Sequence, residues 1–126
     1  MRPRLNYHYT IRFKDITSFL FLQYGVNEEC YKHRIIPRLS SVIEELKRNP
    51  LSRHATIVTL TNDNYACLIS LQFQVVKNKL IMIANFRSQC KTNGRPADTV
   101  MQQYIANKVR RELKLKEYKI YVNVAN

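Results

Sequence analysis

Residues 66–86 read ACLISLQFQVVKNKLIMIANF, and this stretch decides the fold of the chain. Residues 66–76 alternate in character. One face of the predicted strand carries Cys67, Ile69, Leu71, Phe73 and Val75, and the other carries Leu68, Ser70, Gln72 and Gln74. Lys77 and Asn78 are suited to a tight turn, and residues 79–86 return as a second strand. The stretch therefore predicts a β-hairpin.

The open end of this hairpin brings reactive side chains together. With Lys77 and Asn78 as the turn residues, Cys67 is expected opposite Ser88, and Leu68 opposite Arg87, unless a bulge shifts the pairing by one residue. Arginine and serine offer hydrogen-bond donors to a phosphate, and a cationic neighbourhood favours the thiolate form of cysteine. The ordinary alternatives are a buried small apolar cysteine, a solvated arginine and a turn serine.

The segments on both sides of the hairpin predict helices and strands. Upstream, strands are expected over Asn6–Phe13 and His54–Leu60, with a short helix from Asp15 to Gln23. A helix over Pro37–Lys47 carries apolar residues at helical spacing and stops at Asn49-Pro50. Downstream, a helix is expected from Pro96 to Leu115, and a strand from Glu117 to Val124. This order predicts one α+β domain over residues 1–126, with helices to one side of the strands.

The composition points to a phosphate-bearing partner. Lysine and arginine number 21 and the acidic residues 9, which gives a net charge of +12. Such a field attracts nucleotides, nucleic acid or anionic lipid, although a solvated basic surface has the same composition.

The cysteine pattern favours a reducing, cytoplasmic location. Cys30, Cys67 and Cys90 are odd in number and widely spaced, so they form neither a disulfide framework nor a zinc motif, and we expect no metal. The N-terminus does not read as a signal peptide. The longest apolar run is far shorter than the roughly 20 residues that cross a bilayer, so we expect no membrane partner.

Several motifs recur together at fixed distances. Residues 42–58 read VIEELKRNPLSRHATIV, in which a helix ends in Asn-Pro and is followed by Ser-Arg and a hydrophobic strand. Further along come, in order, Cys67, Gln72-Phe73, Lys79-Leu80, Arg87-Ser88, Gly94, Pro96 and Asp98. In these motifs, and more weakly in Tyr24-Gly25 and Arg34, the chain over residues 24–124 resembles the nucleotide-binding core of the thymidylate synthase and dCMP hydroxymethylase family.

The resemblance implies a fold and an assembly. The expected fold is thymidylate synthase-like, a mostly antiparallel or mixed sheet with helices packed on one face. The family forms homodimers whose sheets pack back to back, and the face with Leu68, Ser70 and Gln72 would supply that interface.

The resemblance also implies a chemistry. Cys67 would be the nucleophile that attacks C6 of a pyrimidine nucleoside monophosphate, and C5 would then accept a one-carbon unit from methylenetetrahydrofolate. Arg87 and Ser88 would bind the phosphate. Arg53 and His54 would reach the phosphate from a partner subunit, with His54 in place of the family's second arginine. The base would be contacted by Asp98 and Gln72.

Asp98 bears on the choice of base. The thymidylate enzymes have asparagine there and the cytosine-specific relatives aspartate, and a carboxyl group accepts from the exocyclic amine of cytosine. The alternative is an aspartate that stabilises the N-terminus of the helix starting near Pro96.

The chain also departs from the family. Cys90 occupies the position of an aspartate that contacts folate, and Leu68 occupies that of the usual histidine after the nucleophile. The family's proton-relaying acid is matched only by Glu28 and Glu29, and the sequence ends at Asn126, before the family's sugar-binding strand and folate-contacting tail. Three functions therefore remain: a minimal C5 methyl- or hydroxymethyltransferase, an inactive module that binds nucleic acid, and a protein that only dimerises.

Overall fold

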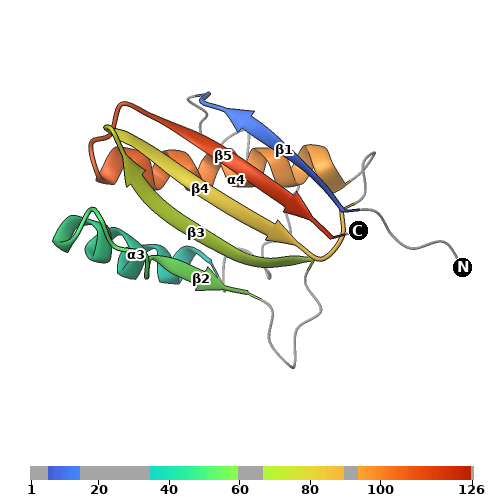
Figure 1. Cartoon of the computed structure of the whole chain (residues 1–126), viewed down its shortest axis with the longest axis horizontal. Coiled ribbons are helices and arrows are strands. Elements are labelled where there is room, and N and C mark those ends of the chain that lie inside the picture. The colour runs from blue at the N-terminus through green and yellow to red at the C-terminus, as the bar shows by residue number, and fades with distance from the viewer. Residues whose placement is uncertain (1–5, 15–34, 60–66, 90–93, 126) are drawn as a thin grey trace, which may run out of the picture.

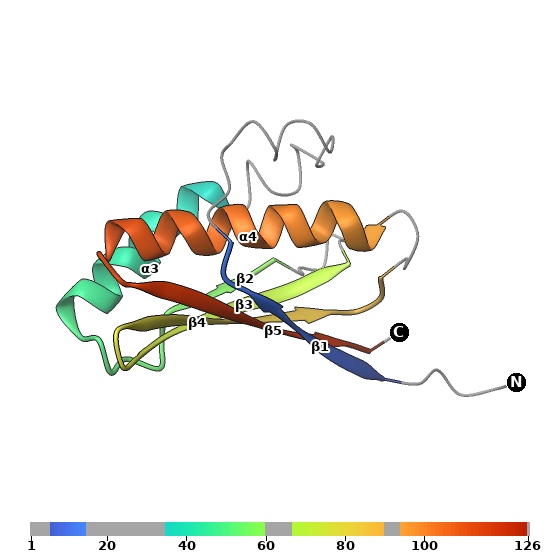
Figure 2. The same cartoon turned by 90° about the horizontal axis from the view of Figure 1, so that it is seen from above.

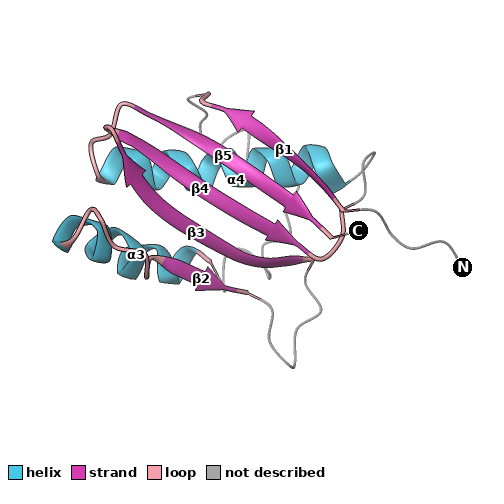
Figure 3. Ribbon diagram, in the orientation of Figure 1, coloured by secondary structure: helices cyan, strands magenta, loops and turns pink. Residues whose placement is uncertain are grey.

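The computed structural model describes residues 6–14, 35–59, 67–89 and 94–125, the last segment from its backbone alone over residues 94–97. Its elements are β1 (Tyr7–Arg12), α3 (Ile36–Arg48), β2 (Thr56–Val58), β3 (Leu68–Val76), β4 (Lys79–Phe86), α4 (Gly94–Glu112) and β5 (Glu117–Val124) (Figure 3). Every predicted element within the described residues is present. The helix expected from Asp15 to Gln23 lies outside them, as do Cys30 and Cys90.

The five strands form one mixed sheet in the order β1-β5-β4-β3-β2 (Figure 1). Three neighbouring pairs are antiparallel, and β4 and β5 are parallel because α4 carries the chain back between them. Lys77 and Asn78 have φ values of 49° and 62°, the left-handed backbone of a two-residue hairpin turn. The predicted hairpin is thus confirmed.

Both helices lie on the same side of the sheet (Figure 2). The apolar stripe of α3 is buried against the sheet through Leu39, Val42, Ile43 and Leu46. The stripe of α4 is buried through Met101, Ile105, Ala106 and Val109. Among the described residues, α3 and α4 cover only this face of the sheet. The sheet is therefore apolar toward the helices and largely polar on its other face. The expected α+β architecture, a mixed sheet with helices on one face, is confirmed.

A β-bulge near the start of β3 corrects the predicted alternation. Leu68 pairs with Phe86, but Ser70 pairs with Asn85, so Ile69 is an extra residue. Leu68 consequently faces the helices and is fully buried, together with Leu71 and Phe73. The prediction that Leu68 shares a face with Ser70 and Gln72 is wrong for this reason.

The bulge also shifts the end of the hairpin by one residue. The Arg87 amide donates to the Cys67 carbonyl at 2.6 Å, so Cys67 lies opposite Arg87 and not opposite Ser88. Leu68 likewise lies opposite Phe86 and not opposite Arg87. The three reactive side chains nevertheless remain at the same end of the hairpin.

Candidate functional site

The open end of the β3–β4 hairpin holds an accessible thiol. Cys67 is a free, exposed cysteine in the residue just before β3. The Ser88 hydroxyl donates to its Sγ at 3.6 Å. Its exposure makes the sulfur accessible to a bound molecule, and the serine hydroxyl lies beside it. The geometry therefore suits a nucleophile better than a buried small apolar residue.

The residues that follow β4 line the same end. Arg87 is exposed and its backbone pairs with that of Cys67, and Ser88 is half-buried with its hydroxyl beside the thiol. A guanidinium offers paired donors to phosphate oxygens, and the hydroxyl adds another donor. This end can therefore bind an anion and present a nucleophile to the group that the anion carries.

Gln89, the next residue, organises the helix side of this end and was not singled out by the sequence. Its side chain is buried. Its Oε1 accepts from the Tyr9 hydroxyl at 2.8 Å and from the Tyr7 hydroxyl at 3.4 Å. Its Nε2 donates to Oδ2 of Asp98 at 3.2 Å. One amide thus connects β1, the end of the hairpin and α4.

Asp98 lies beside the hairpin end through this contact. Helix α4 begins at Gly94 and has no acidic residue in its first turn, so Asp98 lies beyond that turn. The stabilising effect of a charge on a helix terminus falls off within the first turn. Stabilisation of the helix terminus is therefore not favoured for Asp98, and its observed contact is with Gln89. One turn further along, Gln102 is fully buried, and neither of its amide atoms has a hydrogen-bond partner among the described residues.

Arg53 and His54 lie far from Cys67 within one chain. Both are exposed and precede Ala55, whose carbonyl accepts from the Phe73 amide. Phe73 is six residues along β3 from Cys67, which corresponds to about 20 Å of strand. Gln72 is exposed on the uncovered face, opposite Thr56 and Ile83. A single chain therefore brings together Cys67, Arg87, Ser88 and Asp98, but neither Gln72 nor the Arg53–His54 pair.

The loop that carries Arg53 is held by hydrogen bonds to α3. Ser52 donates to Oε1 of Glu45 at 2.7 Å, and the His54 amide donates to Oγ of Ser52 at 3.1 Å. Arg48 also donates to both Glu45 carboxylate oxygens at 2.7 Å. The hydrogen bonds from Arg48 and then Ser52 hold the pKa of Glu45 below its ordinary value. These contacts fix the backbone on both sides of Arg53.

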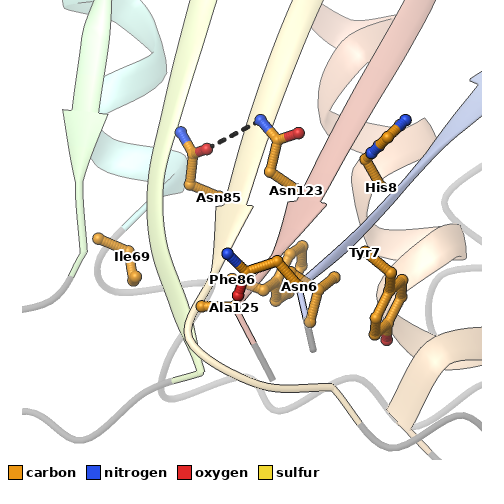
Figure 4. Close-up of a pocket in the computed structure, with 9 residues that line it drawn as sticks. Asn6, Tyr7, His8, Ile69, Asn85, Phe86, Asn123 and Ala125 are labelled. Atoms are coloured by element: carbon orange, nitrogen blue, oxygen red, sulfur yellow. Dashed lines mark hydrogen bonds between the residues drawn. The ribbon is translucent and has the colours of Figure 1, made fainter. Parts of the chain in front are cut away.

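The uncovered face is hollowed near the same end of the sheet (Figure 4). The hollow measures about 400 Å³ and includes Asn6, His8, Ile69 and Phe86 in its lining. Asn123 donates to Asn85 at 3.1 Å, and Asn85 donates to Ser70 at 3.1 Å, so polar side chains connect three strands across this face. Tyr7, whose hydroxyl donates to Gln89, also lines this hollow.

The described residues were also searched for a metal site and a membrane span. No group of three or more His, Cys, Asp or Glu within them is placed to hold a metal ion. Neither α3 nor α4, the helices described, has the length and hydropathy needed to cross a bilayer.

Solved structures with the same fold are thymidylate synthases. The thermostable thymidylate synthase A of Bacillus subtilis superposes with a TM-score of 0.63 and 18% identity, over 69% of this chain and 34% of that one. The thymidylate synthase of T4 phage gives a TM-score of 0.65 and 17% identity, over 69% of this chain and 32% of that one. No protein-family model and no curated protein sequence matches the chain.

The class is therefore defined by its fold: the chain has a thymidylate synthase-like fold and spans about a third of the length of these two enzymes. At 18% and 17% identity, this similarity shows the fold alone.

Proposed function

We propose that this chain binds a pyrimidine nucleoside monophosphate at the open end of the β3–β4 hairpin and transfers a one-carbon unit to C5 of its base through Cys67. The observation that carries this proposal is the exposed Cys67 thiol, with the Ser88 hydroxyl at 3.6 Å and Arg87 opposite it. The thymidylate synthase-like fold gives that arrangement its context.

Phosphate binding comes first in this proposal. Arg87 and Ser88 bind the phosphate of the nucleotide, and this contact brings the base to Cys67. Arg53 and His54 are too far away to help within one chain, so they act from the second copy of a homodimer. Gln72, on the uncovered face of the sheet, lies where such a copy would pack and would contact the base from there.

Cys67 then adds to the base. Its thiolate forms a bond from Sγ to C6, and the electron pair of the C5–C6 double bond moves to C5 and the conjugated ring. C5 becomes nucleophilic and would bond to the electrophilic carbon of the one-carbon donor. Loss of the C5 proton, with breakage of the bond between that carbon and the donor, would leave a methylene group on C5. Addition of water to this methylene carbon, with expulsion of the thiolate from C6, would restore the C5–C6 double bond, give a hydroxymethyl group and free Cys67.

The one-carbon donor comes from the family resemblance, which implies methylenetetrahydrofolate as the source of an electrophilic one-carbon unit. Cys90, at the position of the family's folate-contacting aspartate, lies outside the described residues, so no residue of this chain is assigned to the folate.

Asp98 gives the preferred base. Its carboxyl group accepts hydrogen bonds, so we propose cytosine, with its exocyclic amine, ahead of uracil.

Calorimetric titration with dCMP and dUMP tests nucleotide binding. We expect Arg87→Ala to weaken binding of both nucleotides by at least about tenfold, because a charge-assisted contact is lost. Arg12→Ala is a matched control, since Arg12 lies on the uncovered face of β1 and should leave affinity unchanged. If Arg87→Ala bound dCMP and dUMP as tightly as the wild type does, this site would be refuted.

A second function, an inactive module that binds nucleic acid, is favoured by one feature of the uncovered face. Arg12 and Lys119 lie directly opposite each other in the antiparallel β1–β5 pair. Like charges so placed repel each other, and an anionic partner would relieve that repulsion. Tyr121 is 39% exposed on the same face, under the Lys119 ammonium, and could stack on a base.

The two functions respond differently to substitution. Nucleic-acid binding should weaken with added salt and with Lys119→Ala, and should be indifferent to Cys67→Ala. No retardation of a labelled oligonucleotide at low salt would eliminate the second function.

A further inference from the structure

The Gln89 side chain links the proposed base-reading residue to the sheet. It is 6% exposed, and both ends of its amide are hydrogen-bonded. An amide has two unlike ends: the oxygen only accepts and the nitrogen only donates. Which end meets Asp98 therefore fixes whether the contacted atom of residue 98 acts as an acceptor or as a donor.

The surrounding groups determine the orientation of that amide. Oε1 points to the two tyrosine hydroxyls, with Tyr9 at 2.8 Å and Tyr7 at 3.4 Å. Nε2 points to Oδ2 of Asp98 at 3.2 Å. The reverse orientation would place the amide oxygen against a carboxylate oxygen, where two acceptors repel each other. Because a tyrosine hydroxyl can donate or accept, the contact with Asp98 decides the orientation, with the amide nitrogen toward α4.

This orientation has a consequence for base recognition. Cytosine presents a donor at position 4 and an acceptor at position 3, and uracil presents the reverse. A side chain that contacts position 4 of cytosine must present an acceptor there, and one that contacts position 4 of uracil must present a donor. Gln89 matches the first case, because its Nε2 donates to Oδ2 and so pairs with an acceptor at residue 98.

We propose that Gln89 is a positioning residue that sets the donor–acceptor polarity of residue 98, so that base preference belongs to the pair Gln89–Asp98 and not to Asp98 alone. This inference rests on the proposed function, since it assumes that a pyrimidine nucleotide lies beside Asp98. Tyr9 supports Gln89 through the shorter of the two hydroxyl contacts.

The test uses two variants that carry an amide at position 98. In Asp98→Asn, Gln89 still donates, so the new amide turns its oxygen toward Gln89. In the double variant Asp98→Asn with Gln89→Glu, the carboxylate at position 89 accepts, so the new amide turns its nitrogen toward it. Donor and acceptor exchange places between the two proteins. Calorimetric titration with dCMP and dUMP gives the ratio of the two affinities for each.

We expect this ratio to differ between the single and the double variant by at least about tenfold, in opposite directions of preference. A residue that only supports the fold would lower both affinities together and leave the ratio unchanged. Equal ratios in the two variants would overturn the inference.

Two tyrosine variants test the same inference without changing Gln89 or Asp98. Tyr9→Phe removes the 2.8 Å contact and should reduce the ratio of the wild type by about two- to tenfold. Tyr7→Phe removes the 3.4 Å contact and serves as the matched control with a smaller effect. If the Gln89→Glu double variant does not fold, an unchanged ratio in Tyr9→Phe overturns the inference by itself.

Failure of the inference is distinguishable from failure of the proposed function. If the wild-type protein binds neither dCMP nor dUMP, the proposed function fails. If it binds them, and if Arg87→Ala weakens both without changing their ratio, the proposed function stands and the ratios in the position-89 and tyrosine variants decide the inference.

Discussion

Leu68→Ala tests the β-bulge that shapes the hairpin end. Leu68 is fully buried beside Phe86, because Ile69 is inserted as an extra residue. Truncation of a fully buried leucine removes apolar burial and leaves a cavity, which costs about 2–5 kcal/mol. On a chain of this size that corresponds to a fall in melting temperature of roughly 10 °C. Regular alternation without the bulge would place Leu68 on the uncovered face, where the cost is within about 0.5 kcal/mol.

The assay is urea denaturation followed by circular dichroism, with Gln72→Ala as the matched control. Gln72 is exposed on the same strand, and the unbulged pattern places it on the same face as Leu68. We expect a large decrease in the denaturation midpoint for Leu68→Ala and almost none for Gln72→Ala, with unchanged slopes. A loss below about 1 kcal/mol in Leu68→Ala would contradict the bulge and the placement of Cys67 that depends on it.

Three further predictions concern local contacts. Asn78→Gly should raise the free energy of unfolding by about 0.5 kcal/mol, because Asn78 has φ 62° in the hairpin turn and glycine adopts a positive φ more readily. A lower melting temperature of this variant would contradict the turn. Lys114→Gly should stabilise the protein similarly, because Lys114 has φ 56° just after α4, and unchanged stability would argue against that backbone conformation. The pKa of Glu45 is lower in the folded state than in the unfolded state. Its contribution to the free energy of unfolding is therefore present above the unfolded pKa and is lost as the pH falls through the folded pKa. The stability difference between wild type and Glu45→Gln should therefore shrink as the pH falls below 4.5, the ordinary pKa value of glutamate. A difference that stays constant in denaturation curves over this pH range would count against the Arg48 and Ser52 contacts.

Local patterns were sufficient for most of the fold. Alternation in residues 66–76 and the paired turn residues Lys77 and Asn78 predicted the hairpin, and helical spacing of apolar residues predicted α3. Strand β2 is shorter than predicted, at Thr56–Val58 instead of His54–Leu60, because only these residues pair with β3. Thr59 continues the contact, because its amide donates to the Ile69 carbonyl and its hydroxyl to the Leu68 carbonyl.

The bulge could not be predicted because the sequence around it is ambiguous. Leu68 and Ile69 are both apolar, so either can face the core, and the choice depends on how β3 pairs with β4. The displacement of one residue changes which side chains meet at the site.

The candidate site was predicted in part. Spacing along the hairpin placed Cys67, Arg87 and Ser88 at one end, and they lie there. Gln89 was treated as the first residue of a loop, because its partners Tyr7 and Tyr9 are about 80 residues away in sequence. A contact over that separation leaves no local pattern. The sequence signal available was the position of Gln89, an uncharged polar residue directly after Arg87-Ser88.

The most direct test of the central claim, that Cys67 is a nucleophile toward a pyrimidine nucleotide, is intact-protein mass spectrometry. The protein is incubated with a 5-fluoropyrimidine nucleoside monophosphate and methylenetetrahydrofolate, with Cys67→Ala as the control. Expulsion of the thiolate requires loss of the proton at C5. Fluorine replaces that proton and does not leave, so the bond from Sγ to C6 should persist. We predict a covalent adduct on Cys67 in the wild type and none in the control. An unmodified wild-type mass at saturating nucleotide would contradict the account.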